Sequence, residues 1–69
     1  MNQTRVVDFY GDSGKRWYAV EESSDGGQTF SVCPMLCEYG GRRGADSAAR
    51  AARSLARRNG GTFLGVVRK

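Results

Sequence analysis

The chain has 69 residues, of which 39% are hydrophobic and 26% are charged, and its formal net charge is +4. A chain of this length forms one core, so we expect residues 1–69 to be a single domain. Seven aromatic residues and the hydrophobic content are too much for a disordered tail. The sequence has no histidine, which removes the usual general base and the commonest metal ligand, so we expect no enzyme, no metal site and no cofactor.

The charge is divided unevenly along the chain. Residues 1–35 carry three bases and five acids, a net charge of −2, whereas residues 36–69 carry eight bases and two acids, a net charge of +6. The basic half predicts an acidic partner, such as nucleic acid or an acidic protein surface. Arginines outnumber lysines nine to two, which suits bidentate contacts to phosphate or carboxylate, although a GC-rich genome would give the same bias.

The N-terminal sequence lacks the basic start and continuous apolar run of a signal peptide. No stretch approaches the roughly 20 apolar residues that cross a bilayer. We therefore expect a cytoplasmic protein with no membrane partner.

Three strands are predicted in the first half of the chain. Residues 4–10 and 16–22 alternate around a "GDSG" turn and predict an antiparallel hairpin. Within it, Trp17 is expected in the core and Tyr18 at the surface. A third strand is predicted over residues 28–35, ending near a proline that cannot donate to a sheet.

A loop, a helix and a last strand are predicted next. Residues 36–44 show no period and predict a loop, and Asp46 or Ser47 then caps a helix that continues to Arg58. The "NGG" that follows is a helix stop, and residues 62–69 predict a fourth strand. The expected fold is α+β, with the order β-β-β-α-β and an antiparallel sheet that packs the alanine-rich helix on one face.

The predicted helix has two chemically different faces. At about 100° per residue, its alanines and Leu55 form one arc, which we expect on the sheet, with the aromatic residues Trp17, Phe30 and Phe63 filling the core. Arginines occupy the outer face without an acid to compensate most of them. Such a row is either a solvated face or a binding surface, and we predict binding by Arg42, Arg43, Arg50, Arg53, Arg57 and Arg58.

The two cysteines and two short segments give weaker indications of function. Cys33 and Cys37, in "CPMLC", cannot complete a zinc shell except across a dimer, and they are expected to be buried free thiols in a reducing cytoplasm. The segment "GGRRG" resembles the Gly-x-x-Gly loop of KH domains, and "GADSAARAARSLAR" resembles the last helix of double-stranded-RNA-binding domains.

A resemblance to small phage-encoded proteins covers the C-terminal third. The segment "GADSAARAARSLARRNGGTFLGVV" is similar in pattern to the ending of some anti-CRISPR inhibitors of type I systems. The resemblance implies a stoichiometric inhibitor that binds a host effector, such as a Cas protein in a CRISPR-Cas complex, in the host cytoplasm. Two alternatives stay open: a small nucleic-acid-binding module that uses the same arginines on phosphates, and a structural module. The oligomeric state could be monomer or homodimer.

Overall fold

Two long antiparallel strands form the centre of the sheet. The computed structural model describes residues 2–11 and 14–68. In it, β1 (Gln3–Tyr10) pairs with β2 (Arg16–Ser23) along its whole length, from Gln3 opposite Ser23 to Tyr10 opposite Arg16. The predicted hairpin is confirmed, since alternating β-branched and aromatic residues on both sides of a short turn favour this pairing.

The last strand makes the sheet mixed rather than wholly antiparallel. β5 (Thr62–Arg68) pairs with β1 in parallel, because the chain crosses the sheet through the helix and returns in the direction of β1. The register shifts between Thr4 and Val6, opposite Gly65, whose φ of +100° suits glycine at a bulge. The α+β class is confirmed, and β1 lies between β2 and β5 in the sheet.

The predicted third strand is wrong in its extent. Only β3 (Ser31–Val32) pairs with the end of β2, and a 3₁₀ helix, η1 (Pro34–Leu36), follows it. The chain then rejoins the other end of β2 through β4 (Tyr39–Gly40), within the segment that was expected to be a loop. Pro34 explains the interruption, since it fixes φ and starts the 3₁₀ turn.

The helix begins earlier than predicted. α1 (Gly44–Arg58) has Arg43 at its N-cap position without a side-chain cap, so neither Asp46 nor Ser47 is the cap. Asp46 lies instead in the first turn, where a carboxylate interacts favourably with the helix dipole. The end is as predicted: Asn59 is the C-cap residue, and Gly60 adopts a φ of +66°.

The core lies between α1 and one face of the sheet. Val6, Val20, Ala48 and Ala52 form its centre and are fully buried. The alanines therefore set a close contact between helix and sheet, as predicted. The aromatic prediction is right for Phe63, which packs against this core. It is wrong for Trp17, which alternates to the other side of the sheet while Tyr18 packs against the core. It is also wrong for Phe30, whose ring stacks on the Arg5 guanidinium on that other side.

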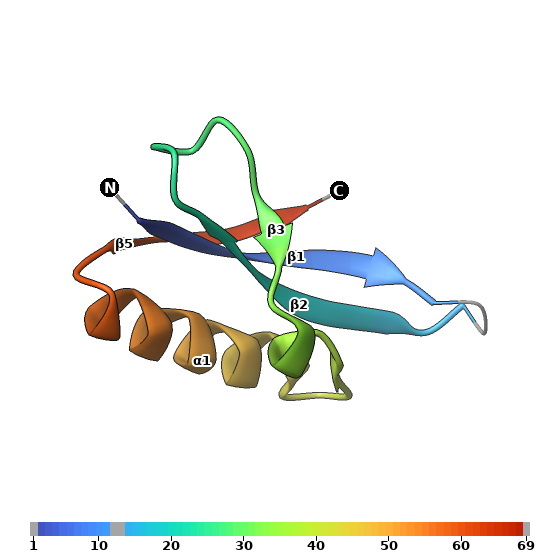
Figure 1. Ribbon diagram of the computed structural model, residues 1–69. Helices are drawn as coiled ribbons and strands as arrows, with labels where there is room; N and C mark the ends of the chain where they lie inside the picture. The colour runs from blue at the N-terminus through green and yellow to red at the C-terminus, as the bar shows by residue number, and fades with distance from the viewer. Residues whose placement is uncertain (1, 12–13, 69) are drawn as a thin grey trace.

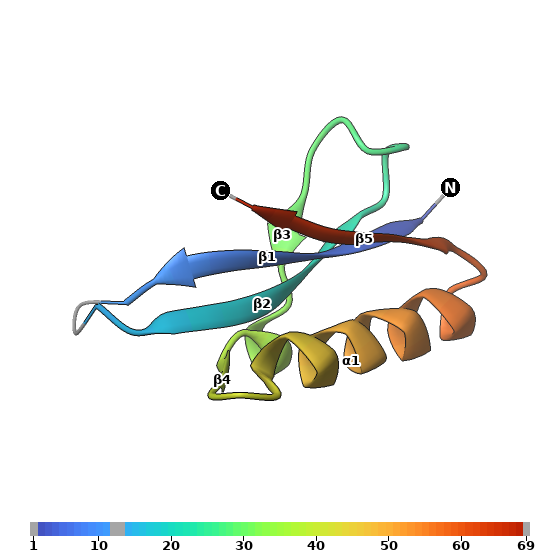
Figure 2. The same cartoon turned by 180° about the vertical axis from the view of Figure 1, so that it is seen from behind.

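Figures 1 and 2 show α1 lying along one side of the sheet, while the loop between β2 and β3 rises on the opposite side. We call this opposite side the open face. Register places Val7 and Phe9 of β1 on it, beside Ala19 and Trp17 of β2. Each central strand thus carries apolar residues on both of its sides.

Candidate functional site

The six predicted binding arginines are all exposed, but they do not form one cluster. Two of them, Arg42 and Arg43, lie in the turn before α1. The other four lie on the helix, at Arg50, Arg53, Arg57 and Arg58, and Arg58 is its last residue. The helix rises about 1.5 Å per residue, so this stretch extends over roughly 20 Å. We call the exposed set the arginine surface: Arg42, Arg43, Arg50, Arg53, Arg57 and Arg58.

Three of the six line one shallow hollow on the outer side of α1. Arg50, Arg53 and Arg57 surround a volume of ≈ 610 Å³, together with Asp46, Ala49 and Ser54. Their spacing of three and four residues places them on the same side of the helix. The hollow is therefore lined by three arginines and one acid, Asp46.

The arginine surface has one acid beside it, Asp46, which lines the same hollow but forms no ion pair with these arginines within the described residues. The N-terminal half differs, because its arginines have ion-pair partners: Arg5 Nη2 lies 2.7 Å from Glu21 Oε1, and Arg16 Nε lies 3.7 Å from Asp8 Oδ2. Within residues 2–11 and 14–68, by contrast, no carboxylate forms an ion pair with any arginine of the arginine surface. Three like charges within about two turns repel one another, and an acidic partner would relieve that repulsion.

Arg53 has a structural contact as well. Its guanidinium lies 5.4 Å from the centre of the Phe63 ring on β5. A cation–π contact at an exposed site contributes about 0.5–1 kcal/mol. Substitution of Arg53 therefore changes packing and charge together, whereas Arg50 and Arg57 offer a cleaner test of binding.

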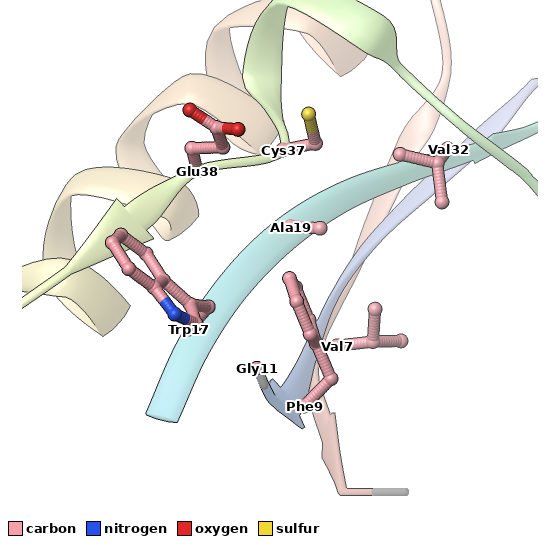
Figure 3. Close-up of a pocket in the computed structure, with 8 residues that line it drawn as sticks. All are labelled: Val7, Phe9, Gly11, Trp17, Ala19, Val32, Cys37 and Glu38. Atoms are coloured by element: carbon pink, nitrogen blue, oxygen red, sulfur yellow. The ribbon is translucent and has the colours of Figure 1, made fainter. Parts of the chain in front are cut away.

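A second hollow lies on the open face, and it was not predicted. It has a volume of ≈ 760 Å³, and Figure 3 shows the side chains of Phe9, Trp17 and Val32 around it, with Val7 and Ala19 between them. Cys37 and Glu38, from the segment before β4, complete its lining with Gly11. The signal in the sequence was the apolar character of both alternating sets in β1, which indicates a strand with two apolar sides.

Trp17 reaches its place because two glycines leave room for its ring. A Cβ atom on Gly11 would lie 2.9 Å from the indole Nε1, and one on Gly40 would lie 2.8 Å from Cζ3. Neither glycine has a positive φ, so the requirement is one of space. The indole thus lies beside Gly11, which follows the end of β1, and beside Gly40 of β4.

Both cysteines are free, as predicted, but they are half-buried rather than buried. Desolvation raises the pKa of the Cys33 thiol, and the charges of Glu22 and Glu21 raise it further. The Cys37 thiol donates to the carbonyl of Pro34 at 3.1 Å. Among the described residues, no three His, Cys, Asp or Glu side chains are grouped so as to hold a metal ion.

No family model, curated protein or solved structure matches the chain significantly. Nor does the part of the chain that the structure describes include a helix long and apolar enough to cross a membrane. The functional interpretation consequently depends on the two surfaces: the arginine surface and the open face.

Proposed function

We propose that the chain is a non-enzymatic binding protein that holds an acidic partner on its arginine surface. The observation that carries the proposal is the row of exposed arginines on α1, none of which has an ion-pair partner within the described residues. Arginine presents its donors in a rigid fork that matches carboxylate and phosphate groups.

The resemblance to phage-encoded anti-CRISPR proteins favours a host protein as the partner. In this form of the proposal, the chain binds a CRISPR-Cas complex in the host cytoplasm and blocks its activity stoichiometrically. The arginine surface would then contact an acidic patch of the effector, since a basic surface is repelled by a basic groove that binds nucleic acid. A rigid helix fits such a role because little order is lost when it binds.

The linear arrangement of Arg50, Arg53 and Arg57 favours nucleic acid as a second candidate. They span about 10 Å along the helix axis, and each strand of a duplex carries one charge per ~3.4 Å of its axis. Phosphate contacts of this kind would bind without reading a base sequence.

Binding to a purified type I CRISPR-Cas complex and to duplex DNA and RNA distinguishes these partners. At ~50 and ~200 mM salt, an inhibitor should keep a stoichiometric complex with the effector while nucleic acid binding is lost. Binding to nucleic acid that weakens gradually with salt, with no effector complex, would support the second candidate instead. Failure to bind any of these probes would overturn the proposal.

Charge reversal on α1 tests the site itself. Arg50→Glu should reduce binding of the partner at least tenfold. The control is Lys15→Glu, which changes the net charge equally at an exposed position outside the arginine surface and should weaken binding less. Both variants should keep the melting temperature of the parent, because Arg50 is exposed and has no ion pair among the described residues. An equal loss of binding in both variants would mean that net charge alone governs the interaction.

A further inference from the structure

The sheet has two edges, and within the described residues the chain covers only one of them. The outer edge of β2 pairs with β3 at one end and with β4 at the other. At the opposite edge, β5 pairs with β1 on its inner side only, and Figure 2 shows it running back along β1 above α1. The outer backbone groups of β5 are therefore open to a partner.

The backbone of β5 determines what can pair with this edge. The Thr62 N–H donates to the Asn2 carbonyl at 3.0 Å. Because pairing groups alternate along a strand, the N–H and C=O of Phe63 point away from β1. A row of such groups is a template for another extended chain. A nucleic acid backbone offers phosphate acceptors but no N–H groups at this spacing, so the edge favours a protein strand.

The side chains of β5 leave room for an added strand. Leu64 and Val67 on the open face are 48% and 38% exposed, and Val66 on the helix side is 50% exposed. Residues 59–67 carry no charge, although a charge is a common device against pairing at an edge. The bulge at Gly65 divides the edge into two short stretches. Backbone pairing with either stretch is limited, so another contact has to add to the affinity.

That additional contact is electrostatic. The Arg53 Cζ lies 5.4 Å from the centre of the Phe63 ring, which places a guanidinium beside the β5 edge. Arg53 has no ion-pair partner within the described residues. A second copy of this chain would bring further arginines to the edge, and like charges repel. A carboxylate in the same place would accept charge-assisted hydrogen bonds from Arg53. The charge at this edge therefore suits an acidic strand.

We propose that an extended acidic segment of the partner pairs with the outer edge of β5 and adds a strand to the sheet. Such pairing depends on the proposed function, which supplies an acidic partner, and it identifies that partner as a protein. Side chains of an added strand alternate between the two sides of the sheet. On the helix side they include a carboxylate beside Arg53, and on the open face they are apolar and cover Leu64 and Val67. The segment that is recognised thus alternates acidic and apolar residues.

A synthetic peptide, acetyl-VEVEVEV-amide, tests the proposal with the isotope-labelled full chain. At ~1 mM, the peptide should slow hydrogen exchange of the Phe63 amide at least about threefold, as measured by NMR, because this N–H becomes hydrogen-bonded. The control peptide carries N-methyl groups on two adjacent central residues, which removes one donor from each edge and keeps every charge. It should bind at least about tenfold more weakly.

The possible results separate strand addition from attraction by charge. Equal affinity of the two peptides would overturn strand addition and leave the proposed acidic partner in place. Absence of any effect of either peptide on β5 would overturn it too. The proposed function fails by a different result, which is no binding to the CRISPR-Cas complex, DNA or RNA. A dimer of the chain alone that Val66→Glu dissociates would assign the edge to a second copy and overturn the proposal.

Two matched variants locate the bound peptide. Val66→Glu and Val32→Glu each place a carboxylate at a half-exposed valine, but Val66 is on the β5 edge and Val32 is on β3, across the sheet. Val66→Glu should weaken binding of the unmethylated peptide at least about tenfold, and Val32→Glu less than about threefold. If Val66→Glu fails to fold, as judged by circular dichroism, Thr62→Glu replaces it, since Thr62 is exposed at the start of the same edge. Equal weakening by the variants at the two positions would overturn the proposal.

Discussion

Asp25 orders the turn that follows β2. Its carboxylate accepts hydrogen bonds from the hydroxyls of Ser23 and Thr29 and from the backbone N–H groups of Gln28 and Thr29. The bond from Ser23 contributes most, followed by those from Thr29, and together they hold the pKa of Asp25 well below its usual value. A single exposed carboxylate therefore fixes a loop that would otherwise have many conformations.

The lowered pKa of Asp25 predicts how stability depends on pH. Because the folded state favours the charged carboxylate, its stabilising effect is complete above the ordinary pKa of 3.8 and is lost as the pH falls below it. Asp25→Asn should thus lower the melting temperature near pH 7, and its difference from the parent should shrink in acid. Glu38→Gln, at an exposed position in the segment before β4, is the control. A difference from the parent that is unchanged between pH 7 and strong acid would contradict the prediction.

At the level of single residues, the alternation of a strand predicts that neighbouring side chains lie on opposite faces of the sheet, but it does not predict which face packs against the core. Trp17 and Tyr18 were correctly placed on opposite sides of β2, yet their roles are reversed. Both β1 and β2 carry apolar residues on each side, so the position of α1 decides the matter, and that is a tertiary property. Nor does the periodicity of the sequence predict that Gly11 and Gly40 leave space for the indole of Trp17.

At the level of elements, the contact between α1 and the sheet depends on small side chains. Ala48 and Ala52 are fully buried, and the Thr4 hydroxyl donates to the Ala52 carbonyl at 2.9 Å. This approach leaves no space for a longer side chain. Ala52→Leu should lower the free energy of unfolding by about 1–3 kcal/mol through overpacking.

Ser54→Leu is the matched control for this helix, since Ser54 is exposed and lies two positions later. It should change the free energy of unfolding by less than about 0.5 kcal/mol. Urea denaturation of the two variants measures both values, with equal slopes expected if only the native state is affected. Equal stabilities of the variants would mean that the helix adjusts its position without cost.

The elements set by local signals were predicted well. The pairing of β1 with β2, the end of α1 at Asn59 and Gly60, and its alanine arc all depend on residues that are close in sequence, although residues 12–13 of the predicted turn lie outside the described residues. By contrast, β3 and β4 are two residues each, and they exist because β2 offers its edge at two separate places. The parallel pairing of β5 also depends on a partner about 60 residues away, which strand propensity cannot specify.

At the level of the whole molecule, charge and apolar area are on opposite sides. The exposed arginines of the candidate site were predictable because helical spacing alone places Arg50, Arg53 and Arg57 together. The hollow on the open face was not predictable because it combines side chains from β1, β2, β3 and the segment before β4. The exposed arginines of α1 and the larger apolar hollow thus lie on opposite sides of the sheet.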